Sequence, residues 1–477
     1  MQTAVHETHI GVVFLIGDRA YKLKKPVRTG FLDFSTRTAR EQACHREVEL
    51  NRRFSPDVYL GVADVSGPDG EPCDHLIVMR RMPSERRLST LVEADAPVAD
   101  ALREIARTLA AWHARAPRGA KISLEGSRRA LRERWQASFA EVRPFGLPEA
   151  PEIERLTSRF LDGRARLLEH RIDEGRIVDG HGDLIADDIF CLDDGPRLLD
   201  CLEFDDRLRR LDGLDDAAFL AMDLERLGAS DLAERFLDWY ADYSGDPAPA
   251  CLRHHYVAYR AFVRAKVACL RSADGDLRAG ENATEFARLA LRHLRAGTVK
   301  LILVGGLPGT GKTSLAGALA DRLGCTVLSS DRVRKELAGI SPHDTAAASY
   351  QSGIYDVAFT YETYAELLDR AERLLGLGES VIIDASWTLA AVRDTAAEVA
   401  ARGYADLVEL RCTTPAEMTT VRMRERTGGI SDADEVISAA MAANADPWPT
   451  ATVVDTAGSL EESLTRALAV VQMRDDS

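Results

Sequence analysis

The stretch from Leu301 to Ser314, which reads LILVGGLPGTGKTS, limits most strongly what this chain can fold into. An apolar run from Leu301 to Val304 is typical of a buried β-strand, and it leads into a loop with glycines at positions 305, 306, 309 and 311. A helical pattern of apolar residues follows, at Leu315, Ala318, Leu319 and Leu323. Glycines let backbone N–H groups turn towards an anion, and the start of the following helix adds its positive end.

Within this stretch Gly306, Gly311, Lys312 and Thr313 satisfy the motif G-x-x-x-x-G-K-[ST]. Lys312 would reach the β- and γ-phosphates as a point charge, and the Thr313 hydroxyl would complete a Mg²⁺ shell. The sequence therefore predicts a site for a nucleoside triphosphate with Mg²⁺. The predicted contacts are Gly306, Gly309, Thr310, Gly311, Lys312, Thr313 and Ser314. The alternative, a glycine-rich turn that binds nothing, is disfavoured by the strand and the helix on either side.

Charge and length limit the partners. With 61 Lys and Arg against 76 Asp and Glu, the net charge is −15, which argues against nucleic acid as the main substrate. No apolar run is long enough to cross a membrane, and the eight cysteines contain no C-x-x-C pair. We expect a cytoplasmic protein of about three domains, and the overall charge leaves room for a local basic groove.

The first 90 residues are expected to be rich in strands, with one helix. Strand-like runs at residues 10–16 and 19–25 meet through Gly17 and Asp18, which favours a hairpin. Because side chains alternate along a strand, Lys22 and Lys24 share one face. In the helix expected from Thr38 to Phe54, Glu47 lies on the apolar stripe of Ala43, Leu50 and Phe54. A carboxylate there needs a cation, and the two lysines are candidates; the alternative is a surface glutamate on a charged helix.

Beyond residue 90 the composition shifts to helix-forming Ala, Leu and Arg, so we place a lobe boundary there. Within this mostly helical region, Asp183, Asp188 and Asp200 sit at the ends of short β-hairpin elements, where loops often carry catalytic residues. Clustered acids in a phosphotransfer setting indicate a base and Mg²⁺ ligands. Taken singly, each aspartate could equally form a turn.

After residue 297 the pattern changes again. Five short apolar strands alternate with helical stretches, at residues 301–304, 326–329, 380–384, 405–411 and 451–455. This alternation predicts an α/β domain with a parallel sheet that is covered by helices on both faces. Right-handed crossovers would place the glycine loop at the carboxyl edge of the sheet, where ligands bind.

Two family resemblances follow from these motifs. Residues 1 to about 295 resemble the aminoglycoside phosphotransferase family, a branch of the protein-kinase-like fold. The remainder resembles small-molecule and zeta-toxin-like P-loop kinases, and the order of the two parts resembles bacterial bifunctional aminoglycoside phosphotransferase/ATP-binding proteins. The resemblance implies an α+β protein-kinase-like fold, with a β-rich N-lobe over residues 1–90 and a helical C-lobe over residues 91–295. An α/β P-loop domain with a parallel sheet would occupy residues 297–477.

The first resemblance assigns roles in the N-terminal part. In the motif His181-Gly182-Asp183, Asp183 matches the base that accepts the proton of the acceptor hydroxyl. Asp188 stands where the family has an Asn that binds Mg²⁺, and Asp200 matches the second metal ligand. The ATP-contacting lysine matches Lys22 or Lys24, and its helix partner matches Glu47. The carboxylate of Asp188 adds a negative charge beside the triphosphate and removes an amide donor.

The second resemblance assigns roles in the C-terminal part. Asp331, after the second strand, could be the acceptor base, and Arg334 could hold the acceptor or a phosphate. Asp384 ends a strand where such folds place an acid that orients Mg²⁺ through water. Arg422 and Arg426, one helical turn apart, resemble lid arginines that close over the transferring phosphate. The alternative for both arginines is a place on the surface.

Together these features predict an ATP-dependent, Mg²⁺-requiring phosphotransferase with two nucleotide-binding kinase domains. Its acceptor would be a small hydroxyl-bearing molecule such as an aminoglycoside or amino sugar. One alternative is a P-loop small-molecule kinase regulated by a non-catalytic, kinase-like sensor domain, which Asp188 favours. Another is an ATPase without a small-molecule acceptor, which Asp331 and the paired arginines disfavour.

Overall fold

The computed structural model describes residues 3–7, 11–28, 33–273, 275–341, 356–424 and 435–473 of the chain. The contacts between residues divide the chain into two compact units. Unit 1 comprises Met1–Pro151, Leu168–Ala248 and Tyr256–Leu291, and unit 2 comprises Glu152–Leu167, Pro249–His255 and Arg292–Ser477. Because neither unit is continuous in sequence, the predicted bounds 1–90, 91–295 and 297–477 stay a prediction.

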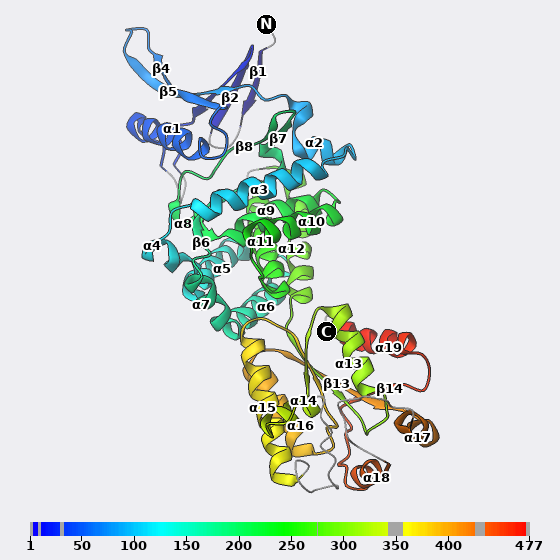
Figure 1. Cartoon of the computed structure of the whole chain (residues 1–477). Coiled ribbons are helices and arrows are strands. Elements are labelled where there is room, and N and C mark those ends of the chain that lie inside the picture. Colours follow the sequence, from blue (N-terminus) through cyan, green and yellow to red (C-terminus); the bar gives the residue numbers. More distant parts are fainter. Residues whose placement is uncertain are drawn as a thin grey trace. The chain divides into compact units, whose positions relative to one another are not determined.

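Unit 1 begins with a five-stranded antiparallel sheet in the order β1-β2-β3-β5-β4 (Figure 1). Its strands are β1 (Thr3–Glu7), β2 (Gly11–Ile16), β3 (Arg19–Lys24), β4 (Tyr59–Ser66) and β5 (Pro72–Arg80). The predicted hairpin joins β2 to β3, with Ile16 opposite Arg19. Gly17 in its turn has φ of 62°, which glycine adopts without a steric cost.

Helix α1 (Arg37–Asn51) packs against β4 and β5. Thr36 caps its start, because the side chain accepts a hydrogen bond from the Ala39 N–H. The side chains of Cys44 and Val48 join the core of the sheet, and Glu47 is buried beside them. Ala43 is only half-buried, so the buried stripe is turned slightly from the predicted one, but Glu47 lies on it as expected.

The rest of unit 1 is mainly helical. Its helices, some of which extend into unit 2, are α2 (Leu88–Glu93), α3 (Ala99–Arg115), α4 (Ala120–Ser123), α5 (Arg128–Val142), α6 (Ala150–Gly163), α7 (Ala165–Asp173), α8 (Asp206–Arg209), α9 (Gly213–Arg226), α10 (Ser230–Ser244), α11 (Ala250–Ala273) and α12 (Leu277–Ala296). Two small antiparallel pairs are β6 (Ile177–Asp179) with β9 (Arg210–Asp212), and β7 (Ile189–Leu192) with β8 (Gly195–Leu198). Helix α9 is buried along most of its length against α3 and α10, so its charged residues need partners inside the protein.

Unit 2 contains a five-stranded sheet in the order β11-β12-β10-β13-β14, and every pairing in it is parallel. The strands are β10 (Lys300–Gly305), β11 (Thr326–Ser329), β12 (Val381–Asp384), β13 (Asp406–Thr413) and β14 (Thr452–Asp455). Each lies within two residues of its predicted range. The strongly apolar central strand β10 is fully buried, as expected for a strand with helices on both faces.

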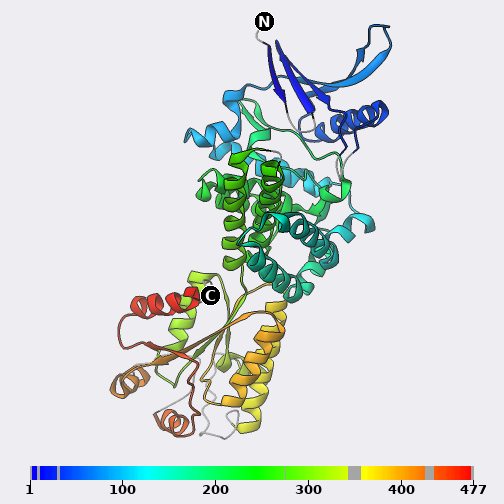
Figure 2. The ribbon, with the colours of Figure 1, turned by 180° about the vertical axis from the view of Figure 1, so that it is seen from behind.

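The helices of unit 2 cover both faces of this sheet. They are α13 (Lys312–Leu323), α14 (Ser330–Leu337), α15 (Val357–Gly376), α16 (Ala390–Arg402), α17 (Ala416–Arg424), α18 (Glu435–Ala443) and α19 (Leu460–Met473). Helices α13 and α19 pack together on one face, and α15 and α16 lie on the other (Figures 1 and 2). The predicted fold class is confirmed: an antiparallel sheet with a helical region, followed by a parallel α/β domain. In the residues that the structure describes, no helix is both long and apolar enough to cross a membrane.

Candidate functional site

The two lysines on β3 meet the buried glutamate of α1. Lys22 Nζ donates to Glu47 Oε1 at 2.8 Å, and Lys24 Nζ donates to Glu47 Oε2 at 2.6 Å. Lys22 Nζ also donates to Asp200 Oδ1 at 2.6 Å, whereas Lys24 pairs with Glu203. Glu47 has no exposed surface, so each of its carboxylate oxygens is matched by one ammonium group.

The surroundings distinguish the two lysines. The side chain of Lys22 is 14% exposed and bridges two carboxylates, while that of Lys24 is 1% exposed and lies 5.1 Å from the ring centroid of Phe34. Burial opposes the charge on Lys22, but Asp200 and Glu47 outweigh it and hold the pKa of Lys22 well above its usual value. Glu203 was not foreseen; a second lysine on the same strand face was the signal that a second buried carboxylate was needed.

Asp200 follows β8 in an unusual backbone conformation. Its φ is 62°, in the left-handed region, which Asp tolerates better than most residues. Its N–H donates to the Tyr59 hydroxyl at 3.1 Å, and the next N–H, that of Cys201, donates to Asn51 Oδ1 at 2.9 Å. These two hydrogen bonds tie the turn to β4 and to the end of α1, and so place the Asp200 carboxylate beside Lys22.

The loop that carries the His-Gly-Asp motif is held by Asp216 of α9. The N–H groups of His181 and Gly182 donate to the two carboxylate oxygens of Asp216 at 2.6 and 2.8 Å. His113 Nε2 lies 3.1 Å from the same carboxylate, which has no exposed surface. Burial opposes ionisation, but the hydrogen bond and charge of His113 hold the pKa of Asp216 below its usual range.

Two further aspartates of α9 support the same loop. Asp215 accepts from Arg260 Nε at 2.7 Å, and Arg260 Nη1 donates to the Gly182 carbonyl at 3.3 Å. Asp223 accepts from the Ala186 N–H at 2.9 Å. Sequence reasoning missed this support, although carboxylates in an otherwise apolar helix, LDDAAFLAMDL, were a signal that it had buried partners.

The predicted acids of unit 1 are electrostatic neighbours. Burial, together with the charge on Asp200, raises the pKa of Asp183 to about 6, although two arginines oppose this. Burial and the charges of Asp200 and Asp183 also raise the pKa of Asp188 well above its usual value. The Asp188 carbonyl accepts from the Leu199 N–H at 3.0 Å, which fixes it across the β7–β8 pair from Asp200. The side chain of His181 is fully buried, and its Nδ1 lies 3.4 Å from the Asp183 backbone nitrogen.

A divalent cation such as Mg²⁺ binds carboxylate oxygens, and its positive charge would relieve the repulsion between these aspartates. Among the described residues, no group of three His, Cys, Asp or Glu side chains is placed to hold a metal ion alone. Mg²⁺ usually takes one or two carboxylates and fills its other positions with phosphate or water oxygens, and the carboxylates of Asp188 and Asp200 fit such an ion.

In unit 2 the glycine loop joins β10 to α13. Gly306, Gly309 and Gly311 have φ of 146°, 83° and 81°, so all three adopt conformations that other residues rarely take. A Cβ at Gly306 would lie 2.8 Å from the Cys412 carbonyl oxygen, and one at Gly309 would lie 3.0 Å from that of Thr419. Gly306 and Gly309 are therefore required both by their backbone angles and by close neighbours, and Gly311 by its backbone angle.

The loop opens onto a cavity of about 380 Å³. Its lining includes Lys312 and Thr313 from the start of α13, and Arg422 from α17. Arg422 Nη2 donates to the Thr456 carbonyl at 2.8 Å, and Thr456 Oγ1 donates to the Thr310 carbonyl at 2.6 Å. Thr456, which sequence reasoning missed, thus links the arginine to the loop. Gly309, Gly311 and Ser314 also line the cavity, whereas Arg426 lies outside the described residues.

The remaining predicted residues of unit 2 follow strands at the same edge of the sheet. Asp384 ends β12 in register with Val304 of β10, and it is 3% exposed. Asp331 lies in the first turn of α14, directly after β11, and its Oδ1 is 3.9 Å from Arg334 Nη1. Asp331, Arg334 and Asp384 are not among the described residues that line the 380 Å³ cavity.

The fold and the loop geometry define a P-loop α/β domain in unit 2, and a family model for an AAA domain matches residues 301–447. Over the whole chain, uncharacterized proteins of Mycobacterium tuberculosis and Mycobacterium bovis are 46% identical over 468 residues, which cover 97% of this chain and 94% of theirs. The chain therefore belongs to the same family as these mycobacterial proteins.

Two groups of solved structures are similar to separate parts of the chain. A sugar kinase from Janibacter sp. HTCC2649 is 21% identical, covers 37% of this chain and 97% of its own, and has a TM-score of 0.29. A choline/ethanolamine kinase family protein from Mesorhizobium loti is 13% identical, covers 62% of this chain and 91% of its own, and has a TM-score of 0.37.

Proposed function

We propose that the chain is an ATP-dependent kinase that transfers the γ-phosphoryl group to a hydroxyl of a small molecule, with one nucleotide site in each unit. The observation that carries this proposal is the cavity of unit 2. A glycine loop, the lysine and threonine at the start of α13, and an arginine from α17 all line that one space. Convergent N–H groups and cations are what a triphosphate requires.

In unit 2, the loop N–H groups and Lys312 would bind the β- and γ-phosphates, and Arg422 would stabilise charge on the transferring group. Thr313 and Asp384 would hold Mg²⁺. Asp331 would accept the proton of the acceptor hydroxyl, and Arg334, buried beside it, would orient the acceptor. Arg426 remains a predicted lid residue.

In unit 1, Lys22 would bind a phosphate, and its bridge to Glu47 and Asp200 supports that role. Asp188 and Asp200 would hold Mg²⁺, which in either unit would neutralise charge on the phosphates. Asp183 would take the proton of the acceptor hydroxyl, and its pKa of about 6 suits a base that works near neutral pH. We assign a positioning role to His181, because its side chain is buried beneath Asp183.

For the acceptor, we propose a hydroxyl-bearing amino sugar or aminoglycoside. The net charge of −15 favours a cationic small molecule over an anionic one. Lys24 would act behind the nucleotide site: its ammonium group, which also pairs with Glu203, neutralises one side of Glu47, so that Lys22 stays directed at Asp200.

A second candidate function gives unit 1 a regulatory role without transfer. The observation that favours it is the carboxylate of Asp188, which faces charge repulsion from Asp183 and Asp200. In that case unit 1 would bind a nucleotide or a small ligand and control the kinase activity of unit 2.

The two candidates differ in which substitution stops transfer. We would incubate full-length protein with ATP, Mg²⁺ and a panel of amino sugars, aminoglycosides and other small alcohols, and identify phosphorylated products by mass. Lys312→Ala should remove the products made by unit 2, and Asp183→Asn those made by unit 1. A product that disappears with Lys312→Ala but survives Asp183→Asn, with none showing the reverse, would support the regulatory role. Hydrolysis of ATP without any phosphorylated product would favour an ATPase.

A further inference from the structure

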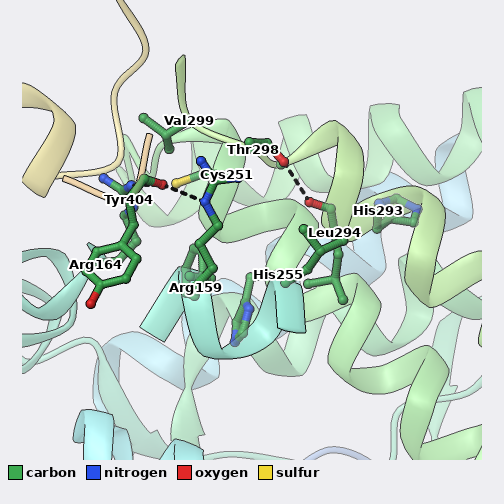
Figure 3. A pocket seen from close by; sticks show the side chains of 12 residues that line it. Arg159, Arg164, Cys251, His255, His293, Leu294, Thr298, Val299 and Tyr404 are labelled. Atoms are coloured by element: carbon green, nitrogen blue, oxygen red, sulfur yellow. Dashed lines mark hydrogen bonds between the residues drawn. The ribbon is translucent and has the colours of Figure 1, made fainter. Parts of the chain in front are cut away.

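A small cavity in unit 2 lies away from the P-loop. It is lined by residues of α6, of the start of α11, of the end of α12 with the segment that follows it, and by Tyr404 after α16 (Figure 3). Its volume is about 20 Å³, which is room for one or two species of the size of a water molecule. Two arginines and two histidines are among its twelve lining residues, and none of the twelve is an Asp or Glu.

Arg164 is the unusual member of this lining. The residue is 2% exposed, and its Nη2 donates to the carbonyl oxygens of Gly403 at 2.6 Å and Tyr404 at 3.4 Å. Its Nη1 is buried without a hydrogen-bond partner among the described residues. Burial, with a smaller contribution from the like charge of Arg159, lowers the pKa of Arg164 to about 10. The guanidinium group is thus a buried positive charge with a donor left over.

Several other buried arginines are paired with carboxylates, whereas Arg393 donates, like Arg164, to backbone carbonyls and lies over the ring of Trp448. Arg171 is paired with Asp212 and Asp246, Arg209 with Asp179 and Asp206, and Arg260 with Asp215. Arg159, next to Arg164 in the cavity, is paired with Asp406 at 2.5 Å. Because a buried charge is costly unless a counter-charge is near, the missing partner of Arg164 calls for an explanation.

The backbone holds Arg164 in place. Gly163 lies so close to the turn after α16 that a Cβ there would be 2.8 Å from the Gly403 carbonyl oxygen and 2.9 Å from Tyr404 Cβ. On the other side of the cavity, the ring of His255 stacks on Phe160 with centroids 3.9 Å apart, and burial lowers the pKa of His255 to about 3. His255 is therefore neutral near pH 7, and the charge to be balanced is that of Arg164.

We propose that this cavity binds a small monovalent inorganic anion of halide size, held by the Nη1 group of Arg164. Chloride is slightly larger than water and accepts hydrogen bonds, so it suits both the space and the free donor. Tetrahedral oxyanions such as phosphate or sulfate are too large for about 20 Å³. The anion would supply the counter-charge that Arg164 lacks among the described residues, and would stabilise the packing of α6 against the turn at Gly403. This inference is independent of the proposed kinase activity.

Two measurements test the site on the full-length protein. The first measurement is the width of the ³⁵Cl NMR line of a chloride solution. The parent protein should broaden this line, and added bromide should reverse the broadening by competing for the site. Arg164→Met should lose the effect, whereas Arg155→Met should keep it; Arg155 lies on α6, which ends one residue before Arg164, but its side chain is 54% exposed and paired with Glu152. In crystals soaked in bromide, an anomalous peak should lie beside Arg164 Nη1.

The melting temperature of Arg164→Met shows whether this variant folds and whether it still responds to chloride. In gluconate buffer at matched ionic strength, Arg164→Met should melt at the same temperature as the parent or higher, because it removes an uncompensated charge. Added chloride should raise the melting temperature of the parent and not that of Arg164→Met. Equal chloride responses in the two proteins, or water and no bromide in the cavity, would overturn the proposal.

Discussion

At the residue scale, a cluster of charged side chains in unit 1 joins the sheet to the helical region. Residue type and motif spacing pointed to Lys22, Lys24, Glu47 and Asp200, and the structure brings all four together. Which lysine faces Asp200 could not be predicted, because both share one strand face. Lys24 instead forms an ion pair with Glu203, which lies far from it in sequence.

The pKa of Asp183 predicts a pH-dependent stability. A carboxyl group raised from 3.8 to about 6 by folding favours its protonated form in the folded state. The folded protein is therefore penalised as the pH rises from about 4 through 6, and the penalty is complete above that range. Asp183→Asn should remove it, so the variant should gain stability over the parent between pH 4 and pH 7.5. Thermal unfolding without nucleotide or Mg²⁺ would measure this; a difference that does not change with pH would show that Asp183 titrates normally.

Asp188→Asn tests whether Asp188 binds Mg²⁺ or only repels the phosphates of the nucleotide. If Asp188 helps to hold Mg²⁺, exchanging an anionic oxygen for a neutral one should weaken the binding of nucleotide with Mg²⁺ or leave it similar. If its charge only repels the phosphates, the amide should tighten binding, by about 1 to 4 kcal/mol for a unit charge near 4 Å. Titration of nucleotide at fixed Mg²⁺, in a Lys312→Ala background that silences unit 2, decides between them. Tighter binding without faster transfer would favour the regulatory role.

At the element scale, the clarity of a strand's apolar run determined how closely the sequence predicted that strand. In unit 2, β10 and β12 are buried throughout and form continuous apolar runs, as expected for parallel strands with helices on both faces. The other three strands, β11, β13 and β14, are partly exposed and were indicated by apolar runs between helical patterns. In unit 1, β2 and β3 were indicated by residue range, but β1 and β4 were not. Both are edge strands of the sheet, with partly exposed side chains and a weak apolar pattern.

Helix α9 acts as the support of the His-Gly-Asp loop, and Asp216 is its main contact. Asp216→Asn places an amide where two backbone N–H groups and His113 need an acceptor. We expect a loss of about 2 to 4 kcal/mol in the free energy of unfolding, since at least one buried donor is left without an acceptor. Chemical denaturation would measure it, with Asp242→Asn on the exposed side of α10 as the control. Equal stability of the two variants would show that the loop does not depend on α9.

At the scale of the whole molecule, the chain combines an antiparallel sheet and helical region with a parallel P-loop domain. The sequence predicted both parts, because each has a local motif and a distinct periodicity. It could not predict that residues 152–167 and 249–255 pack with the P-loop domain in unit 2, since those helical segments look like their neighbours in sequence. The cavity beside Arg164 depends on that packing and was likewise not predictable.

If one chain holds two separate nucleotide sites, as we propose, the number of nucleotides bound per chain should show it. A non-hydrolysable ATP analogue with Mg²⁺ would be titrated calorimetrically into the full-length parent, Lys312→Ala, Lys22→Met and the double variant. Lys22 is paired with two carboxylates and Lys312 lines the 380 Å³ cavity, so neither is part of the apolar core, and circular dichroism would verify folding. We expect two equivalents per chain in the parent, one in each single variant and none in the double variant. A single equivalent in the parent, or two in Lys312→Ala, would contradict the account.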